Sequence, residues 1–159
     1  MSSALKNLSE FSTKDLPNIA QKRFAIVVSE WNTEVTSALY TGAYDTLLKF
    51  GASESNITST QVPGSFELSL GAQKMAERNE IDAVICLGCV IQGETRHFDF
   101  ICQAVADGIT NVSLKYNKPV IFGVLTPNNQ EQAMDRAGGK HGNKGDEAAI
   151  TAIKMLAIN

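Results

Sequence analysis

Long apolar runs are missing from this sequence of 159 residues, whereas a membrane-spanning helix needs about 18 consecutive apolar residues. The first 21 residues are polar and lack the apolar core of a secretory signal peptide. Positive charge is also scarce, because 14 Lys and Arg residues stand against 17 Asp and Glu residues, for a formal net charge of −3. We therefore expect a cytoplasmic protein that binds neither a membrane nor nucleic acid.

Charged residues make up only 19% of the chain, below the share of about a quarter that is usual for globular proteins. Hydrophobic residues make up 43%, which is enough for the core of one domain of this length. The low charge share suggests that further surface is buried against other subunits. The composition predicts a single domain over residues 22–159, preceded by an arm over residues 1–21, in a homo-oligomer.

Cysteine is rare as well, and the three thiols do not form a pattern that suits redox or metal chemistry. Cys86 and Cys89 have the CxxC spacing, but redox-active CxxC motifs lie exposed at a helix N-terminus. Here Cys86 falls inside the apolar run 83–87, and Val90 and Ile91 follow Cys89. We expect these thiols to be small buried apolar groups, with no metal site.

Four short predicted strands alternate with segments of helical periodicity. Residues 24–28, 83–87 and 120–125 are apolar runs typical of buried parallel strands, and residues 57–62 are rich in residues that favour strands. The helical segments cover residues 33–50, 65–76, 95–116, 128–137 and 146–156. This alternation with short links predicts an α/β protein, a three-layer αβα sandwich with a four-stranded parallel sheet and flavodoxin-like winding.

Helix starts and loops give finer expectations. The predicted N-caps are Asn32 or Thr33, then Ser65, then Asn128 with Glu131 three residues later as a capping box. The glycine-rich and basic segment 138–145 predicts a flexible loop before the last helix.

The most informative segment is GCVIQGETRHFD, residues 88–99. An apolar strand ends at Gly88, a polar turn follows, and a helix is expected to begin near Thr95 with His97 in its first turn. A strand that turns into a helix directs free backbone N–H groups at one point, which favours an anion. A histidine beside that point can transfer protons near neutral pH. The alternative is an ordinary βα turn with a surface histidine.

Five other residues are candidates for ligand binding or catalysis, and each also has a purely structural interpretation. Trp31 has polar neighbours, so its ring suits either stacking on a flat ligand or the core. Glu67 either binds ligand hydroxyl groups or complements a helix dipole. Arg136 and Lys144 are candidate phosphate cations or solvated charges. Glu147 is a carboxylate that orients a histidine or begins a helix.

Five segments, in this order, resemble the lumazine synthase family over residues 22–156. They are VVSEWN (27–32), VPGSFE (62–67), the segment 88–99, PVIFG (119–123) and RAGGKHGNKG (136–145). The resemblance implies condensation of 5-amino-6-(D-ribitylamino)uracil with 3,4-dihydroxy-2-butanone 4-phosphate. The products are 6,7-dimethyl-8-ribityllumazine, phosphate and water, in the penultimate step of riboflavin biosynthesis. Both substrates are small molecules. Because the reaction transfers no hydride or electron, we expect neither a cofactor nor a metal.

The resemblance also implies roles for individual residues. Trp31 stacks on the pyrimidine, and His97 transfers protons with the Glu147 carboxylate near it. The ribityl chain and the heterocycle are held by Ser65, Phe66, Glu67, Cys89, Val90 and Ile91. The phosphate is bound by Glu94 and Thr95 through their main-chain N–H groups, with Arg136 as its cation, and Lys144 stays a candidate substrate-binding residue. Gln92 and Glu94 depart from the family pattern, which usually has a basic and a small residue there.

For assembly, the resemblance implies that Phe122 comes from an adjacent subunit. It implies pentamers and, because the segment 138–145 carries no insertion, a shell of sixty subunits. Riboflavin synthase is a candidate partner. The alternatives are a non-catalytic flavin- or lumazine-binding shell protein on the same scaffold and a flavodoxin-like electron carrier. Retained His97 and Arg136 argue against the first, and the missing phosphate loop after the first strand argues against the second.

Overall fold

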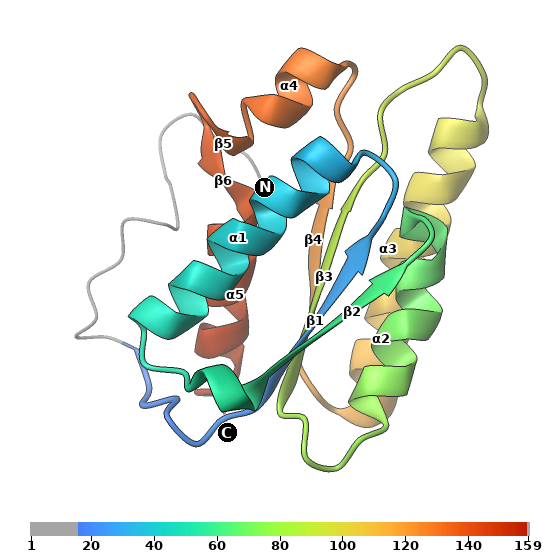
Figure 1. Ribbon diagram of the computed structural model, residues 1–159. Helices are drawn as coiled ribbons and strands as arrows, with labels where there is room; N and C mark the ends of the chain where they lie inside the picture. Colours follow the sequence, from blue (N-terminus) through green and yellow to red (C-terminus); the bar gives the residue numbers. More distant parts are fainter. Residues whose placement is uncertain (1–15, 159) are drawn as a thin grey trace.

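The computed structural model describes residues 16–158 and builds them around a four-stranded parallel sheet (Figure 1). The strands lie in the order β2-β1-β3-β4. They are β1 (Phe24–Ser29), β2 (Ile57–Val62), β3 (Ala83–Cys89) and β4 (Val120–Leu125). Every residue of β1 and β3 is buried, because both faces of the sheet are covered. The four predicted strands are therefore confirmed.

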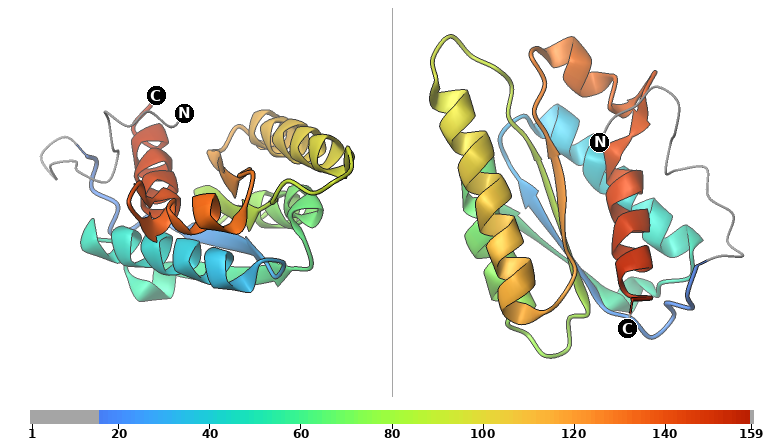
Figure 2. Two further views of the ribbon diagram at one scale, coloured as in Figure 1. Left: turned by 90° about the horizontal axis from the view of Figure 1, so that it is seen from above. Right: turned by 180° about the vertical axis from the view of Figure 1, so that it is seen from behind.

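Two helices cover each face of the sheet, as Figure 2 shows from above. On one face lie α1 (Thr33–Lys49) and α5 (Lys144–Met155), and on the other lie α2 (Leu68–Ala76) and α3 (His97–Tyr116). Alternate residues of β1 serve the two layers. Phe24, Ile26 and Val28 belong to the core beneath α1 and α5, and Ala25 and Val27 to the core beneath α2 and α3. The three-layer αβα sandwich is confirmed.

The carboxyl ends of the strands meet at one edge of the sheet. Ser29 pairs with Val62 across β1 and β2, and Cys89 pairs with Leu125 across β3 and β4. The prediction that the third strand ends at Leu87 was wrong by two residues, because β4 continues to pair with β3 through this segment. All loops that follow the strands begin at this edge, where ligands bind in open parallel sheets.

The segment 138–145 is not the flexible loop that its composition predicts. It forms an antiparallel hairpin of β5 (Ala137–Gly139) and β6 (Gly142–Asn143), and α5 already begins at Lys144. The Asn143 side chain holds the hairpin in place, since its amide donates to the Ala38 carbonyl and its oxygen accepts from the Gly145 N–H. Tertiary hydrogen bonds thus order a segment whose glycines favour disorder.

The predicted helix caps need correction. Asn32 precedes α1 in the left-handed region with φ 59°, and its side chain does not cap the helix. Ser65 starts a short 3₁₀ turn, η4 (Ser65–Glu67), and its hydroxyl makes no cap. The short helix α4 (Gln130–Met134) is capped by Asn129, whose side chain accepts from the Gln132 N–H, and not by Asn128. This helix ends before residue 137 because Ala137 joins the hairpin.

One further 3₁₀ turn, η3 (Glu54–Asn56), precedes β2. Within residues 16–158, no helix combines the length and the apolar character needed to cross a membrane. Most of the predicted arm over residues 1–21 lies outside the described residues, so the division of the chain at residue 22 stays a prediction.

Candidate active site

The loop between β3 and α3 leaves the sheet at its carboxyl edge. The N–H of Val90 still donates to Leu125 and that of Gln92 to Pro127, after which residues 93–97 are exposed. The helix α3 begins at His97, whose N–H lies 3.4 Å from the Thr95 hydroxyl. Glu94 and Thr95 therefore immediately precede the positive end of a 20-residue helix, as the sequence predicts for an anion site.

Arg96 adds a cation at this helix start that the sequence reasoning did not single out. Its Nε lies 3.5 Å from a carboxylate oxygen of Asp99, and its guanidinium lies 5.7 Å from the Phe100 ring centroid. All three side chains are exposed at the end of α3. The position of Arg96 directly before His97 is the sequence feature that could have indicated this cation.

The turn η4 forms a second wall of the site. A carboxylate oxygen of Glu67 accepts from the Gly64 N–H at 3.0 Å, which leaves its other oxygen for a ligand. The Phe66 ring is exposed, and the Ser65 hydroxyl is buried. Trp31 lies beside the start of this turn, since its N–H donates to the Pro63 carbonyl and a Cβ placed on Gly64 would lie 3.4 Å from its Cδ1.

Trp31 is 72% exposed, so it lies in a loop and not in the core. The next residue connects this loop to β3, because the Asn32 amide donates a 2.8 Å hydrogen bond to the Cys89 carbonyl. Val90 and Ile91 continue from Cys89 as half-buried residues. The structure thus brings the tryptophan, η4 and the end of β3 together.

The CxxC thiols are buried, as predicted. Burial raises the pKa values of both Cys86 and Cys89 to about 12. Both thiols therefore stay protonated at neutral pH and act as apolar groups. Among residues 16–158, no cluster of three or more His, Cys, Asp or Glu side chains is arranged to hold a metal ion.

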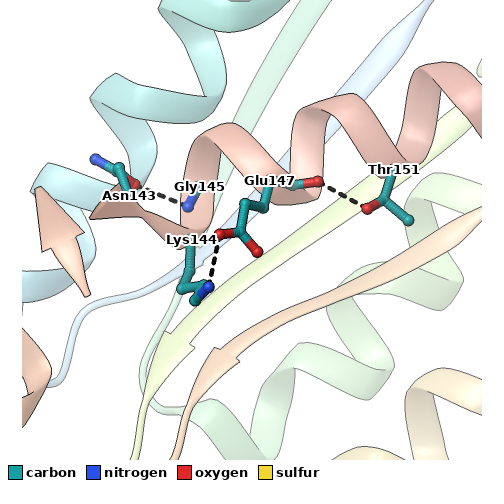
Figure 3. Close-up of polar contacts among 5 residues, drawn as sticks. All are labelled: Asn143, Lys144, Gly145, Glu147 and Thr151. Atoms are coloured by element: carbon teal, nitrogen blue, oxygen red, sulfur yellow. Dashed lines mark hydrogen bonds and ion pairs between the residues drawn. The ribbon is translucent and has the colours of Figure 1, made fainter. Parts of the chain in front are cut away.

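The remaining predicted residues form a second group near α5 (Figure 3). Lys144 Nζ lies 2.6 Å from a carboxylate oxygen of Glu147, and the two side chains are only 18% and 12% exposed. The Glu147 carbonyl accepts from the Thr151 hydroxyl. Because α5 and α3 cover opposite faces of the sheet, this pair and His97 belong to different layers of one chain.

Arg136 borders this second group, whereas Phe122 lies on the other face of the sheet, on the same side of β4 as Val120 and Val124. Arg136 donates from Nη1 to the Gln132 carbonyl at 3.0 Å, and its own carbonyl accepts from the Lys144 N–H. Phe122 is exposed on β4, which is an edge strand of the sheet. The residues that the sequence predicts for the site therefore do not all lie together in one chain.

Comparisons with known proteins agree with this arrangement. The family model of 6,7-dimethyl-8-ribityllumazine synthase matches residues 21–159. A 6,7-dimethyl-8-ribityllumazine synthase of Cytophaga hutchinsonii is 69% identical, covering 99% of this chain and 98% of the relative. The chain belongs to this family. Relatives of the same name from Parabacteroides distasonis and Flavobacterium johnsoniae are 51% and 52% identical over 98% and 99% of this chain, and the matches cover 98% and 83% of those relatives.

Membership of the lumazine synthase family confirms the resemblance that the five segments predict, since all five lie within the matched residues. It supports an enzyme over the non-catalytic shell protein. Sequence reasoning missed the hydrogen bond from Asn32 to Cys89, because an asparagine just before a helix is typically an N-cap. Ser29, which ends β1, lies in the resembling segment 27–32, but the sequence analysis assigns no separate role to it.

Proposed function

We propose that this chain condenses 5-amino-6-(D-ribitylamino)uracil with 3,4-dihydroxy-2-butanone 4-phosphate and releases 6,7-dimethyl-8-ribityllumazine, phosphate and water. The chain is a transferase of riboflavin biosynthesis, as its family membership indicates. The observation that carries the proposal is the meeting of exposed Trp31 with η4 and the end of β3 at the edge where α3 begins. That edge offers a flat aromatic surface, hydrogen-bonding groups and an anion site together.

The pyrimidine stacks on Trp31, an exposed aromatic face beside polar groups. Ser65, Phe66 and Glu67 hold the ribityl chain and the polar groups of the ring, and the free carboxylate oxygen of Glu67 accepts from a hydroxyl. Cys89, Val90 and Ile91 line the heterocycle through apolar and backbone contacts.

The phosphate of the second substrate binds where the main-chain N–H groups of Glu94 and Thr95 precede α3. Because only main-chain donors are needed there, the unusual Glu94 side chain can point to solvent. Arg136 and Lys144 supply positive charge. Imine formation, loss of phosphate and ring closure with loss of water each move a proton, and exposed His97 is the group that transfers it.

The complete site is shared between two chains. Lys144 and Glu147 lie in the layer opposite α3, so a second copy is needed to bring such a pair against His97. Phe122, exposed on an edge strand, is the aromatic residue that an adjacent subunit contributes. Holding two substrates together in such a closed site supplies much of the rate gain.

The assembly that meets this need is a pentamer, with twelve pentamers forming a shell of sixty subunits. Exposed apolar side chains on α2 and α3, namely Leu70, Phe100 and Leu114, support extensive subunit contacts. Riboflavin synthase is the candidate partner, and the cytoplasm is the proposed location.

Mixing the purified chain with both substrates tests the proposed reaction directly. We expect the absorbance and green fluorescence of the lumazine to appear together with inorganic phosphate, faster than in a mixture without protein. Omitting either substrate is the control. Binding of the pyrimidine without faster product formation would favour the non-catalytic shell protein instead.

Light scattering tests the proposed assembly. A mass near sixty times the 17.1 kDa of one chain supports the shell, and one near five times supports the pentamer. A monomer that still turns over would contradict the shared site.

A further inference from the structure

Two serine hydroxyls lie buried beneath the proposed pyrimidine site. Ser29 is the last residue of β1 and is 1% exposed, and Ser65 is the first residue of η4 and is 6% exposed. Within the described part of the chain, neither Oγ atom has a hydrogen-bond partner. Buried hydroxyl groups are almost always hydrogen-bonded, so this pair requires a third polar group.

Gly88 is the point at which the two hydroxyls converge. A Cβ atom placed on this glycine would lie 2.7 Å from Ser65 Oγ and 3.3 Å from Ser29 Oγ. Leu68 borders the same space, with Cδ1 2.9 Å from that position. A side chain at position 88 would therefore collide with Ser65 and Leu68, and the glycine allows both hydroxyl groups to lie close to β3 and to each other.

We propose that one buried water molecule bridges Ser29 Oγ and Ser65 Oγ beside Gly88 and thereby positions η4. Water donates and accepts, so a single molecule satisfies both hydroxyls, and polar sites of this kind commonly hold one.

The bridge matters because the hydrogen bonds that Glu67 makes with Gly64 do not tie η4 to the sheet. The Gly64 N–H donates to the Glu67 carboxylate, and the Glu67 N–H donates to the Gly64 carbonyl at 3.2 Å. The bridge from Ser65 to Ser29 connects the turn to β1 instead. Ser29 is then a positioning residue that acts through Ser65, a role that rests on the proposed function.

A double-mutant cycle tests the bridge without any assay of activity. Ser29→Ala, Ser65→Ala and the double variant are unfolded with denaturant at one fixed protein concentration. Each single substitution is expected to lower the folding equilibrium constant about fivefold, the effect of one hydrogen bond. The double variant should fall little further, because either substitution already removes the bridge. Unchanged or increased stability in the single variants, or additive effects, would overturn the proposal.

Ser113→Ala is the matched control for the cycle. Its hydroxyl donates to the Lys118 carbonyl at 2.7 Å, near the C-terminal end of α3 and far from Gly88. Its effect should add to that of Ser29→Ala. A crystal structure gives a second measurement that needs no reversible unfolding. A solvent peak within hydrogen-bond distance of both Oγ atoms supports the bridge, and a dry contact between them overturns it.

Steady-state kinetics of Ser29→Ala test the positioning role. We expect KM for the pyrimidine substrate to rise about fivefold, while kcat and the KM of the butanone phosphate change little. A loss of stability with an unchanged KM would leave Ser29 with no positioning role. If the stability effects of the two serine substitutions are not additive but the protein forms no lumazine, the proposed function is overturned and the bridge is not. If the two effects are additive in an active enzyme, the bridge is overturned and the proposed function is not.

Discussion

The side-chain amide of Asn32 donates a 2.8 Å hydrogen bond to the backbone carbonyl of Cys89, 57 residues later in the chain. Asn32 has φ 59°, a conformation that asparagine tolerates better than most residues. The bond connects the loop that carries Trp31 to the end of β3. It therefore sets how the proposed stacking ring lies relative to the proposed heterocycle site.

Asn32→Gly and Asn32→Ala separate the hydrogen bond from the backbone conformation. Glycine keeps the positive φ but loses the bond, so we expect KM for the pyrimidine to rise about fivefold with little loss of stability. Alanine loses the hydrogen bond and also disfavours the positive φ, so the free energy of unfolding of Asn32→Ala should be lower by a further ~1 kcal/mol. Thermal unfolding and steady-state kinetics give the two readouts. Equal KM values in the glycine variant and the unsubstituted enzyme would show that the bond does not position the loop.

Trp31 should report on ligand binding through its fluorescence. It is the sole tryptophan of the chain and is 72% exposed, so a stacked ligand changes its surroundings directly. We expect riboflavin or a ribitylamino-pyrimidine analogue to quench its emission in a titration. An emission spectrum that stays constant at saturating ligand would argue against stacking on this ring.

His97→Asn should slow turnover by about 10²–10⁴-fold with nearly unchanged substrate binding, because a positioned acid–base group is lost. The effect is smaller where water replaces the imidazole. His141→Asn is the matched control, since His141 is the only other histidine and lies in the turn between β5 and β6. Rates of the unsubstituted enzyme that do not change between pH 6 and 8 would also contradict a proton-transfer role for His97.

Arg136→Ala should act mainly on the phosphorylated substrate. A charged hydrogen bond contributes about 1.5–3 kcal/mol, so the KM of the butanone phosphate should rise by about one to two orders of magnitude. The KM of the pyrimidine should stay unchanged. Lys140→Ala is the control, because Lys140 lies in the same hairpin region but pairs with Asp135 at 2.7 Å. Equal weakening of both substrates would assign Arg136 to the fold or to a subunit contact.

Asp146→Asn should stabilise the protein at neutral pH. Burial raises the pKa of Asp146 in the first turn of α5 above its value in the unfolded chain. Folding therefore favours the protonated form of Asp146. The stability that this form provides is fully present below the unfolded-state pKa and is lost as the pH rises through the higher folded-state pKa. The advantage of the asparagine variant should disappear below pH ~4, where the aspartic acid is itself protonated.

Denaturation midpoints at pH 4 and pH 7 measure this difference, with the exposed Asp107→Asn as control. A lower midpoint for Asp146→Asn at pH 7 would mean that the attraction of the carboxylate to the helix N-terminus exceeds the desolvation penalty.

The sequence by itself determined the layers of the fold and the family. Continuous apolar runs mark strands that are buried on both faces, and helical periodicity between them requires a parallel sheet with covered faces. Polar neighbours place Trp31 in a loop, and the strand–turn–helix pattern places His97 at the start of a helix. These features depend on residues close together in the chain, which is why their spacing predicts them.

Only the tertiary structure decided which distant groups meet. It directed Asn32 to Cys89 instead of to its own helix, ordered residues 138–145 through Asn143, and brought Ser29 and Ser65 together at Gly88. It also placed Lys144 and Glu147 in the layer opposite α3. Each contact depends on strand register and on how layers pack, and the residues that pack together are separated by whole elements. The spacing of residues along the chain therefore does not predict these contacts.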